Sequence, residues 1–151
     1  MKLKQLSLFL ENRPGHLLNA CRIIADAGLN VETMKLADTE QYGILRILVR
    51  DWEKGLALFE SCGIVVKVTD VLAVCVPDQP GGLAGLLAAF TGSDINIEYM
   101  YGFNSHIDGK AIIVLRLDRP DEAIQLLEKA HVHVLSREEV FRTEAQGHRG
   151  E

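Results

Sequence analysis

Two short turns in the chain combine the residue types that can hold a small charged molecule. Each contains a Pro-Gly pair, at 14–15 and 80–81, directly before a helix-like segment. The first backbone N–H groups of a helix have no partner within the helix, so they attract an anion such as a carboxylate. Asn12 and Asp78, two residues before each proline, offer oxygen acceptors for an ammonium group. The two turns therefore suit a ligand that carries both charges, such as a free amino acid.

The same turns also have an explanation that needs no ligand. Proline presets φ near −65° and glycine lets the backbone turn sharply, so a Pro-Gly pair is a good start for any helix. Asn30 and Asn96, one helix later, would then only satisfy backbone groups beside a turn. From the residues alone both interpretations stay open.

The two turns belong to an internal repeat. Residues 11–34 and 77–100 align without a gap at an offset of 66, with six of 24 residues identical. The same offset pairs Gly43 with Gly109 and Arg50 with Arg116, and an offset of 68 pairs Val66 with Val134. A repeat of this length indicates duplicated structural units. We expect one unit at 1–69, a second at 70–140, and a disordered polar tail at 141–151.

Composition limits the classes of partner. The chain has 151 residues and a net charge of −5, which argues against nucleic acid and anionic membranes as partners. No apolar run approaches 18 residues, so no membrane span is expected. The cysteines are three in number and widely spaced, which suits a reducing cytoplasm. Units of about 70 residues bury only about 60% of their unfolded surface, so they are expected to share a sheet, pack helices together or dimerise.

Hydrophobic periodicity and turn residues predict the same order of elements in both repeats. The first repeat is expected to contain a strand, a helix, two strands, a helix and a strand, at 4–10, 16–27, 29–37, 44–50, 52–62 and 64–68. The second is expected to contain strands at 71–76, 95–103, 111–117 and 132–135, a helix at 80–93, and a second helix that Asp118 caps. The strand at 95–103 alternates, with Ile95, Ile97, Tyr99, Tyr101 and Phe103 on one face.

The element order predicts the fold class. Each repeat reads β-α-β-β-α-β, so the protein is expected to be α+β, with two ferredoxin-like units whose antiparallel sheets carry helices on one face. No Gly/Ser-rich linker separates the repeats, since the fourth strand runs through Thr69-Asp70 almost directly into the fifth.

A family resemblance rests on the segment from Glu11 to Leu17, which ends a strand and opens a helix, and on Leu29-Asn30-Val31 one helix later. The second repeat matches through Pro80-Gly81 with Leu83 and through Ile95-Asn96-Ile97. With these motifs the chain resembles the ACT domain, a small-ligand regulatory module, and is most similar to stand-alone proteins made of two ACT repeats. The resemblance covers about residues 4–140.

The resemblance implies an amino-acid site between two modules, formed by the strand–helix turn of one module and an Asn at the start of the neighbour's second strand. In the first repeat the implied binding residues are Asn12, Arg13, Gly15, His16, Leu17 and Asn30. In the second they are Asp78, Gln79, Gly81, Gly82, Leu83 and Asn96. The exchange of Asn12 for Asp78 places an anion where a ligand carboxylate would approach, so the second site differs in chemistry from the first.

The helix expected at 80–93 carries no charged residue. Opposite its core-facing leucines lie small residues, among them Ala84, Gly85 and Ala88, where a surface helix is normally polar. We expect this Gly82–Gly92 helix to pack against its counterpart in a second chain and form a homodimer. The alternative is a small exposed patch that the protein tolerates.

Catalysis, metal binding and RNA binding find little support. His131 and His133 share a strand face and could begin a metal site, but a partly exposed pair on an outer strand explains them without a metal, and His16 has no nucleophile to activate. RNA-binding sheets of this fold carry aromatic residues chiefly on their first and third strands, and the third strands expected here, 44–50 and 111–117, have none. The expectation is a non-catalytic regulatory protein without cofactor that binds a free amino acid in the cytoplasm. An enzyme of amino-acid metabolism or a regulator is its implied partner, and the alternative function is an adaptor that works through protein contacts alone.

Overall fold

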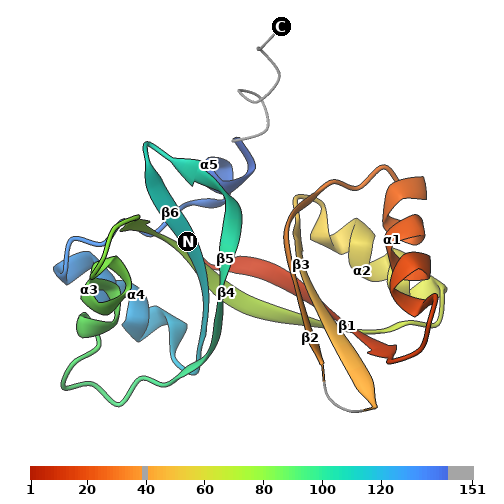
Figure 1. Ribbon diagram of the computed structural model, residues 1–151, viewed down its shortest axis with the longest axis horizontal. Coiled ribbons are helices and arrows are strands. Elements are labelled where there is room, and N and C mark those ends of the chain that lie inside the picture. The colour runs from red at the N-terminus through yellow and green to blue at the C-terminus, as the bar shows by residue number, and fades with distance from the viewer. Residues whose placement is uncertain (39–40, 143–151) are drawn as a thin grey trace, which may run out of the picture. The chain divides into compact units, whose positions relative to one another are not determined.

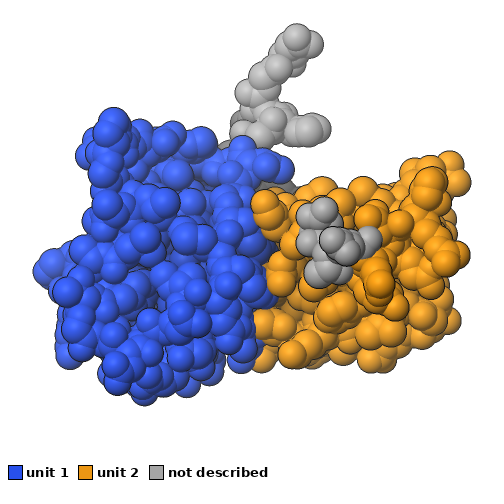
Figure 2. Space-filling view, turned by 60° about the horizontal axis from the view of Figure 1, so that its bottom comes forward, with its two compact units in different colours: residues 1–3, 70–151 blue, residues 4–69 orange. Residues whose placement is uncertain are grey.

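The computed structural model describes residues 1–38 and 41–142. The chain divides into two compact units, one for each repeat (Figure 2). The first-repeat unit consists of Lys4–Thr69. The second-repeat unit begins at Asp70 and also takes in Met1–Leu3.

The first-repeat unit is a four-stranded antiparallel sheet with two helices on one face. Its elements are β1 (Leu3–Glu11), α1 (His16–Asp26), β2 (Val31–Asp38), β3 (Tyr42–Val49), α2 (Trp52–Ser61) and the first part of β4 (Val65–Pro77). The strand order is β2-β3-β1-β4. Figure 1 shows α1 and α2 on the same side of β1 and β3. Alternate residues of β1, namely Leu6, Leu8 and Leu10, pack there against Ile24 of α1 and Phe59 of α2.

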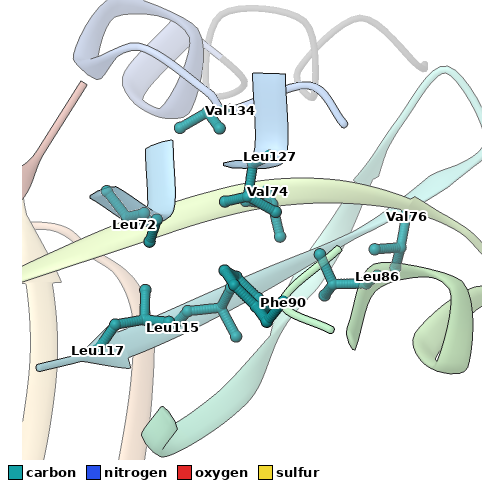
Figure 3. Close-up of a cluster of buried hydrophobic side chains, with 10 residues drawn as sticks. Leu72, Val74, Val76, Leu86, Phe90, Leu115, Leu117, Leu127 and Val134 are labelled. Atoms are coloured by element: carbon teal, nitrogen blue, oxygen red, sulfur yellow. The ribbon is translucent and has the colours of Figure 1, made fainter. Parts of the chain in front are cut away.

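The second-repeat unit repeats this design with its own core. Its elements are the rest of β4, α3 (Gly82–Ala88), β5 (Ile97–Ile107), β6 (Lys110–Leu117), α4 (Pro120–Lys129) and α5 (Arg137–Arg142). The strand order is β4-β6-β5. Figure 3 shows the core between this sheet and its helices, where Leu72, Val74 and Val76 of β4 meet Phe90 and Leu127. The predicted α+β fold class, with two ferredoxin-like units, is confirmed.

The strands predicted at 64–68 and 71–76 are a single strand. β4 runs without a break from Val65 to Pro77, through Thr69 and Asp70. Its first part lies beside β1 and its second part pairs with β6, so the backbone stays extended across the boundary between the repeats.

The helix predicted at 80–93 is shorter. α3 ends at Ala88, and the chain continues in turns where Ala89, Phe90 and Thr91 donate to the carbonyl three residues earlier. At the end of this region, the hydroxyl of Ser93 donates a hydrogen bond to the Phe90 carbonyl at 2.7 Å. Four glycines in the segment, Gly81, Gly82, Gly85 and Gly92, weaken its helix propensity, which explains why the regular helix does not extend further.

The alternation predicted for 95–103 is wrong for the aromatic residues. The pairing of β5 with β6 shifts register between Ile97 and Tyr99. Because of this shift, both Ile97 and Met100 pack against the core. Tyr99 and Tyr101 therefore lie on the opposite face of the sheet from Ile97.

The end of the second repeat also differs from the prediction. The strand expected at 132–135 is an isolated bridge between Val74 and Val134, and Asp118 accepts from the backbone N–H of Asn96 rather than capping α4. The helix α5 was not predicted, and its Phe141 is buried although it belongs to the expected tail. The rest of that tail, 143–151, lies outside the described residues.

The strand pairing corrects the alignment of the repeats. Leu10 lies opposite Gly43, and its counterpart Val76 lies opposite Ala111 rather than Gly109. The offset is therefore already 68 in the third strand of each repeat. The two-residue insertion lies in the longer β5–β6 hairpin, which places Lys110 at the position of Tyr42.

Candidate functional site

Both predicted turns adopt the sharp geometry that the Pro-Gly pairs suggest. Gly15 precedes α1 with φ of 88°, and Gly81 precedes α3 with φ of 86°, a region that favours glycine. The N–H of His16 donates to the Arg13 carbonyl at 3.3 Å, and the N–H of Gly82 donates to the Gln79 carbonyl at 3.0 Å. One of the backbone N–H groups at the start of each helix is thus used inside the turn itself and is not available to a ligand.

The first turn carries an exposed ion pair. The Arg13 guanidinium Nε lies 3.1 Å from Oε2 of Glu11. The backbone N–H of Asn12 donates to the Gln41 carbonyl at 3.1 Å, which ties the turn to the start of β3. A cation and an anion therefore lie side by side on a fixed loop, with the exposed Asn12 between them in sequence.

A hollow of about 610 Å³ lies beside this turn, where β1 ends and β4 begins. Its lining consists of Phe9, Leu10, Glu11, His16, Asn19, Tyr42, Gly63, Ile64 and Val65. Three of these side chains are large, apolar and exposed: Phe9 at 39%, Tyr42 at 52% and Val65 at 67%. Of the predicted binding residues of the first repeat, only His16 lines the hollow, while Asn12, Arg13, Gly15 and Leu17 form the exposed turn next to it.

The second turn has a hollow of about 420 Å³ at the equivalent place. All nine positions that line the first hollow have a counterpart in its lining, once the offset of 66 is applied to β1 and α1 and the offset of 68 to the rest. These counterparts are Cys75, Val76, Pro77, Gly82, Gly85, Lys110, His131, Val132 and His133. The predicted residues Gln79 and Gly81 also line this hollow.

The second turn is closed by contacts that the first does not make. A carboxylate oxygen of Asp78 lies 2.9 Å from Nε2 of His106, at the end of β5. Gly82 is buried, and a Cβ added to it would collide with the carbonyl oxygen of Pro77. The equivalent residue in the first repeat is His16, whose side chain is only partly buried.

Cys75 and His133 both line the second hollow. The N–H of Cys75 donates to the carbonyl of His133 at 3.0 Å, and the ring of His133 lies 2.8 Å from a carboxylate oxygen of Glu139. Burial raises the pKa of the Cys75 thiol, and nearby Lys110 only partly opposes this rise, so the thiol stays protonated. The second hollow is therefore lined by a neutral thiol and by basic side chains.

Asn30 and Asn96 lie far from the turns of their own units. Val31, the first residue of β2, lies opposite Val49, whereas Glu11, just before the turn, lies opposite Tyr42. Seven residues of β3 separate the two places, which amounts to about 23 Å along a strand. Two hydrogen bonds join Asn96 to Asp118. The backbone N–H of Asn96 donates to a side-chain oxygen of Asp118 at 2.9 Å, and the backbone N–H of Asp118 donates to the carbonyl of Asn96 at 3.2 Å. No single unit brings its Asn and its turn together.

Most of the residues that line the hollows were not identified from the sequence. Phe9, Glu11, Asn19 and Tyr42 have no motif in common, and Lys110 and His131 stand far from the second Pro-Gly pair in sequence. The available signal was the repeat itself, but only the strand register reveals the offset that makes Tyr42 and Lys110 equivalent. Within 1–38 and 41–142, no three His, Cys, Asp or Glu side chains gather in a way that could hold a metal ion.

Comparison with known proteins places this geometry in a family. The sequence model of the ACT domain pair matches residues 1–143. The chain belongs to the ACT domain-pair family. This pair also resembles the crystal structure of protein BT0572 from Bacteroides thetaiotaomicron, with 32% identity, a TM-score of 0.87, and coverage of 94% of this chain and 97% of that one.

More distant neighbours share the fold. The regulatory subunit of aspartate kinase from Thermus thermophilus, in its ligand-free form, superposes with a TM-score of 0.61 at 16% identity over 84% of this chain and 91% of that one. Aspartate kinase from Clostridium acetobutylicum superposes at 0.58 with 15% identity, over 85% of this chain and 32% of that one. No curated protein sequence matches the chain. ACT domain pairs are regulatory modules, and no helix in the described part of this one is long and apolar enough to cross a membrane.

Proposed function

We propose that this ACT domain pair is a non-catalytic regulatory protein that binds a free amino acid at the turn of its first repeat. The observation that carries the proposal is the combination, at one turn, of the exposed Glu11–Arg13 ion pair with the adjoining hollow. A free amino acid has an ammonium group for the carboxylate, a carboxylate for the guanidinium, and a side chain for the hollow. Asn12 would supply a further hydrogen bond from the same turn.

The second repeat supports the assignment to the first by contrast. Pro77 and Gln79 stand where Glu11 and Arg13 form their ion pair, so neither charge is present. Asp78 and His106 form an exposed contact there instead, and this turn offers no guanidinium group for a ligand carboxylate. We therefore propose one amino-acid site for each chain. Its Asn partner, in the way the family resemblance implies, would be Asn30 or Asn96 of a neighbouring module, because Asn30 lies about 23 Å from the turn within its own unit.

A calorimetric screen against the 20 amino acids tests the proposal. We expect at least one amino acid to bind, and Arg13→Gln, which installs the residue of the second repeat, to weaken that binding about tenfold through the loss of a charged hydrogen bond. The matched control is Gln79→Ala in the second turn, which should leave binding unchanged. An absence of binding across the whole panel would contradict the proposed function.

The mode of regulation follows from the position of the site. A ligand that bridges a turn of one module and a strand of another favours the arrangement of modules for which it has the higher affinity. An enzyme of amino-acid metabolism or a transcriptional regulator that reads this arrangement is the partner class we propose. The aspartate kinase regulatory subunit, which shares the fold, is a known example of an ACT protein that serves an enzyme. All three cysteines are free, which suits the cytoplasm as its location.

We also propose a homodimer through α3. Leu83 is 46% exposed and Leu87 is 38% exposed, and the small residues Ala84, Gly85 and Ala88 are exposed between and beside them. Small residues allow two helices to approach closely. Light scattering on Ala88→Glu is the test: the variant should be monomeric, and an unchanged mass would contradict the dimer.

A further inference from the structure

The first hollow gathers exposed apolar side chains, including two aromatic rings. Single exposed apolar residues are ordinary on a protein surface and need no explanation. Here Phe9, Tyr42 and Val65 come from three different strands and line the same concave site. A concave site with apolar walls and a few polar groups is the usual composition of a small-molecule pocket, and about 610 Å³ lies within the usual range of roughly 300–1,000 Å³.

The strand register places the two rings side by side. Tyr42 lies opposite Glu11, and Phe9 lies opposite Ile44, so Phe9 and Tyr42 are diagonal neighbours on one face of the sheet. Leu8 and Leu10 point to the other face, where they pack in the core with α1 and α2, and Leu10 also lines the hollow at its edge with the core. The backbone separation of diagonal neighbours is about 7–8 Å, which leaves a ligand ring within the stacking distance of either aromatic side chain.

Three polar side chains line the hollow near the turn. Glu11 and His16 flank the turn, and Asn19 follows one helical turn later on α1. The Glu11 carboxylate is already 3.1 Å from Arg13, so it is held next to a cation and is not an isolated charge. A ligand whose charged groups contact this pair would direct its side chain towards Phe9, Tyr42 and Val65.

The second hollow lies at the equivalent position but lacks the aromatic side chains that line the first. Its counterparts of Phe9, Tyr42 and Val65 are Cys75, Lys110 and His133, so its lining holds no aromatic hydrocarbon ring. Gly82 and Gly85 replace His16 and Asn19. Since the backbone design is shared, the aromatic lining is not a requirement of the fold at this position.

We propose that the first hollow receives an aromatic side chain, so that the ligands of this protein are the aromatic amino acids. This inference rests on the proposed function and names the ligand class of the same site. The ring would stack on Phe9 and Tyr42 and contact Val65, while the ammonium and carboxylate groups would contact Glu11 and Arg13.

Titration calorimetry on the full chain tests the inference with phenylalanine, tyrosine, tryptophan, leucine, lysine and aspartate as probes. We expect the aromatic probes to bind at least about tenfold more tightly than the others. Tyr42→Ala should weaken aromatic binding about tenfold, whereas Tyr42→Phe, which keeps the ring, should retain it. The control in the second hollow, Lys110→Ala, should leave binding unchanged.

The outcomes separate the inference from the function on which it rests. Binding of leucine, lysine or aspartate that is unaffected by Tyr42→Ala would overturn the aromatic preference and leave amino-acid binding intact. If phenol binds in a way that depends on Tyr42 but no amino acid binds, the hollow accepts rings and the amino-acid function fails. If Tyr42→Ala converts a dimer to a monomer without changing ligand affinity, the hollow is covered by a second copy and the inference is wrong.

Discussion

The hollow of the first repeat is lined by Phe9, Tyr42 and Val65, and that of the second by Cys75, Lys110 and His133 at the same positions. The turn beside the first carries the exposed Glu11–Arg13 ion pair, while the turn beside the second carries an exposed contact between Asp78 and His106 and no arginine. Duplication thus preserved the backbone around the hollow, while the side chains that line it changed independently. If only the first repeat binds a ligand, as we propose, the second is free to serve the fold.

The largest difference that we expect concerns Gly82, the glycine at the start of α3. Gly82→Ala should destabilise the protein by about 3 kcal/mol, because the new Cβ would collide with the Pro77 carbonyl and the backbone would have to move. The measurement is urea unfolding. Gly85→Ala is the matched control: nothing lies within 4 Å of a Cβ there, so it should be neutral or slightly stabilising. Equal losses at both positions would mean that the second turn is not closed in this way.

The next largest effect that we expect is a difference between the two turns in how a substitution changes ligand affinity. Asn12→Ala should weaken amino-acid binding about tenfold, or about 1.4 kcal/mol, since a hydrogen bond to a charged ligand group is lost. Asp78→Ala should leave the affinity unchanged, because its carboxylate is paired with His106. Calorimetric titration of both variants is the measurement. A larger loss for Asp78→Ala than for Asn12→Ala would reverse the roles of the two repeats.

A third difference is the residue type at a left-handed backbone position that lines each hollow. His131 has φ of 58°, a left-handed conformation that its counterpart Gly63 adopts with φ of 73°. His131→Gly should therefore stabilise the protein by about 1 kcal/mol, and Gly63→Ala should destabilise it by about as much. Thermal unfolding of the two variants checks this. Destabilisation by His131→Gly would show that the imidazole makes a favourable contact larger than the backbone strain.

The smallest effect concerns α5, which the first repeat lacks. The Ser136 N–H donates to Glu139 at 2.7 Å, and this bond, together with His133, lowers the pKa of the Glu139 carboxyl. Because the folded pKa is lowered, the contribution to stability is present above the usual pKa of glutamate, about 4.3, and is lost as the pH falls through the lower folded value. Glu139→Gln should reduce the acid dependence of unfolding slightly. An identical pH profile for the variant and the parent would rule out this contribution.

How far the sequence predicts the structure depends on the range of the interaction. Helix starts at Pro14-Gly15 and Pro80-Gly81 follow from local chemistry, and the structure places both turns where they were expected. The continuous β4 was not predictable from Thr69-Asp70, because its extended form depends on pairing with strands distant in sequence. The early end of α3 was missed because apolar residues continued the helical period beyond Ala88.

The candidate site likewise has local features that the sequence predicts and long-range features that it does not. The turn residues could be named from the motif, and they do form exposed turns beside hollows. The pairing of Asp78 with His106 joins residues 28 apart in sequence, and the contact of Gly82 with Pro77 depends on the path of the turn. Both require the folded backbone. The equivalence of Tyr42 and Lys110 depends on strand register, which an offset read from identities in the sequence assigned incorrectly by two residues.

We propose that the first repeat binds an amino acid and that the second does not. The stoichiometry of a calorimetric titration tests this, with the full chain and the tightest-binding amino acid from the screen. We expect one ligand for each chain, with the heat lost in Arg13→Gln and retained in Gln79→Ala. Two equivalent ligands for each chain, or heat that disappears only when the second turn is altered, would contradict it.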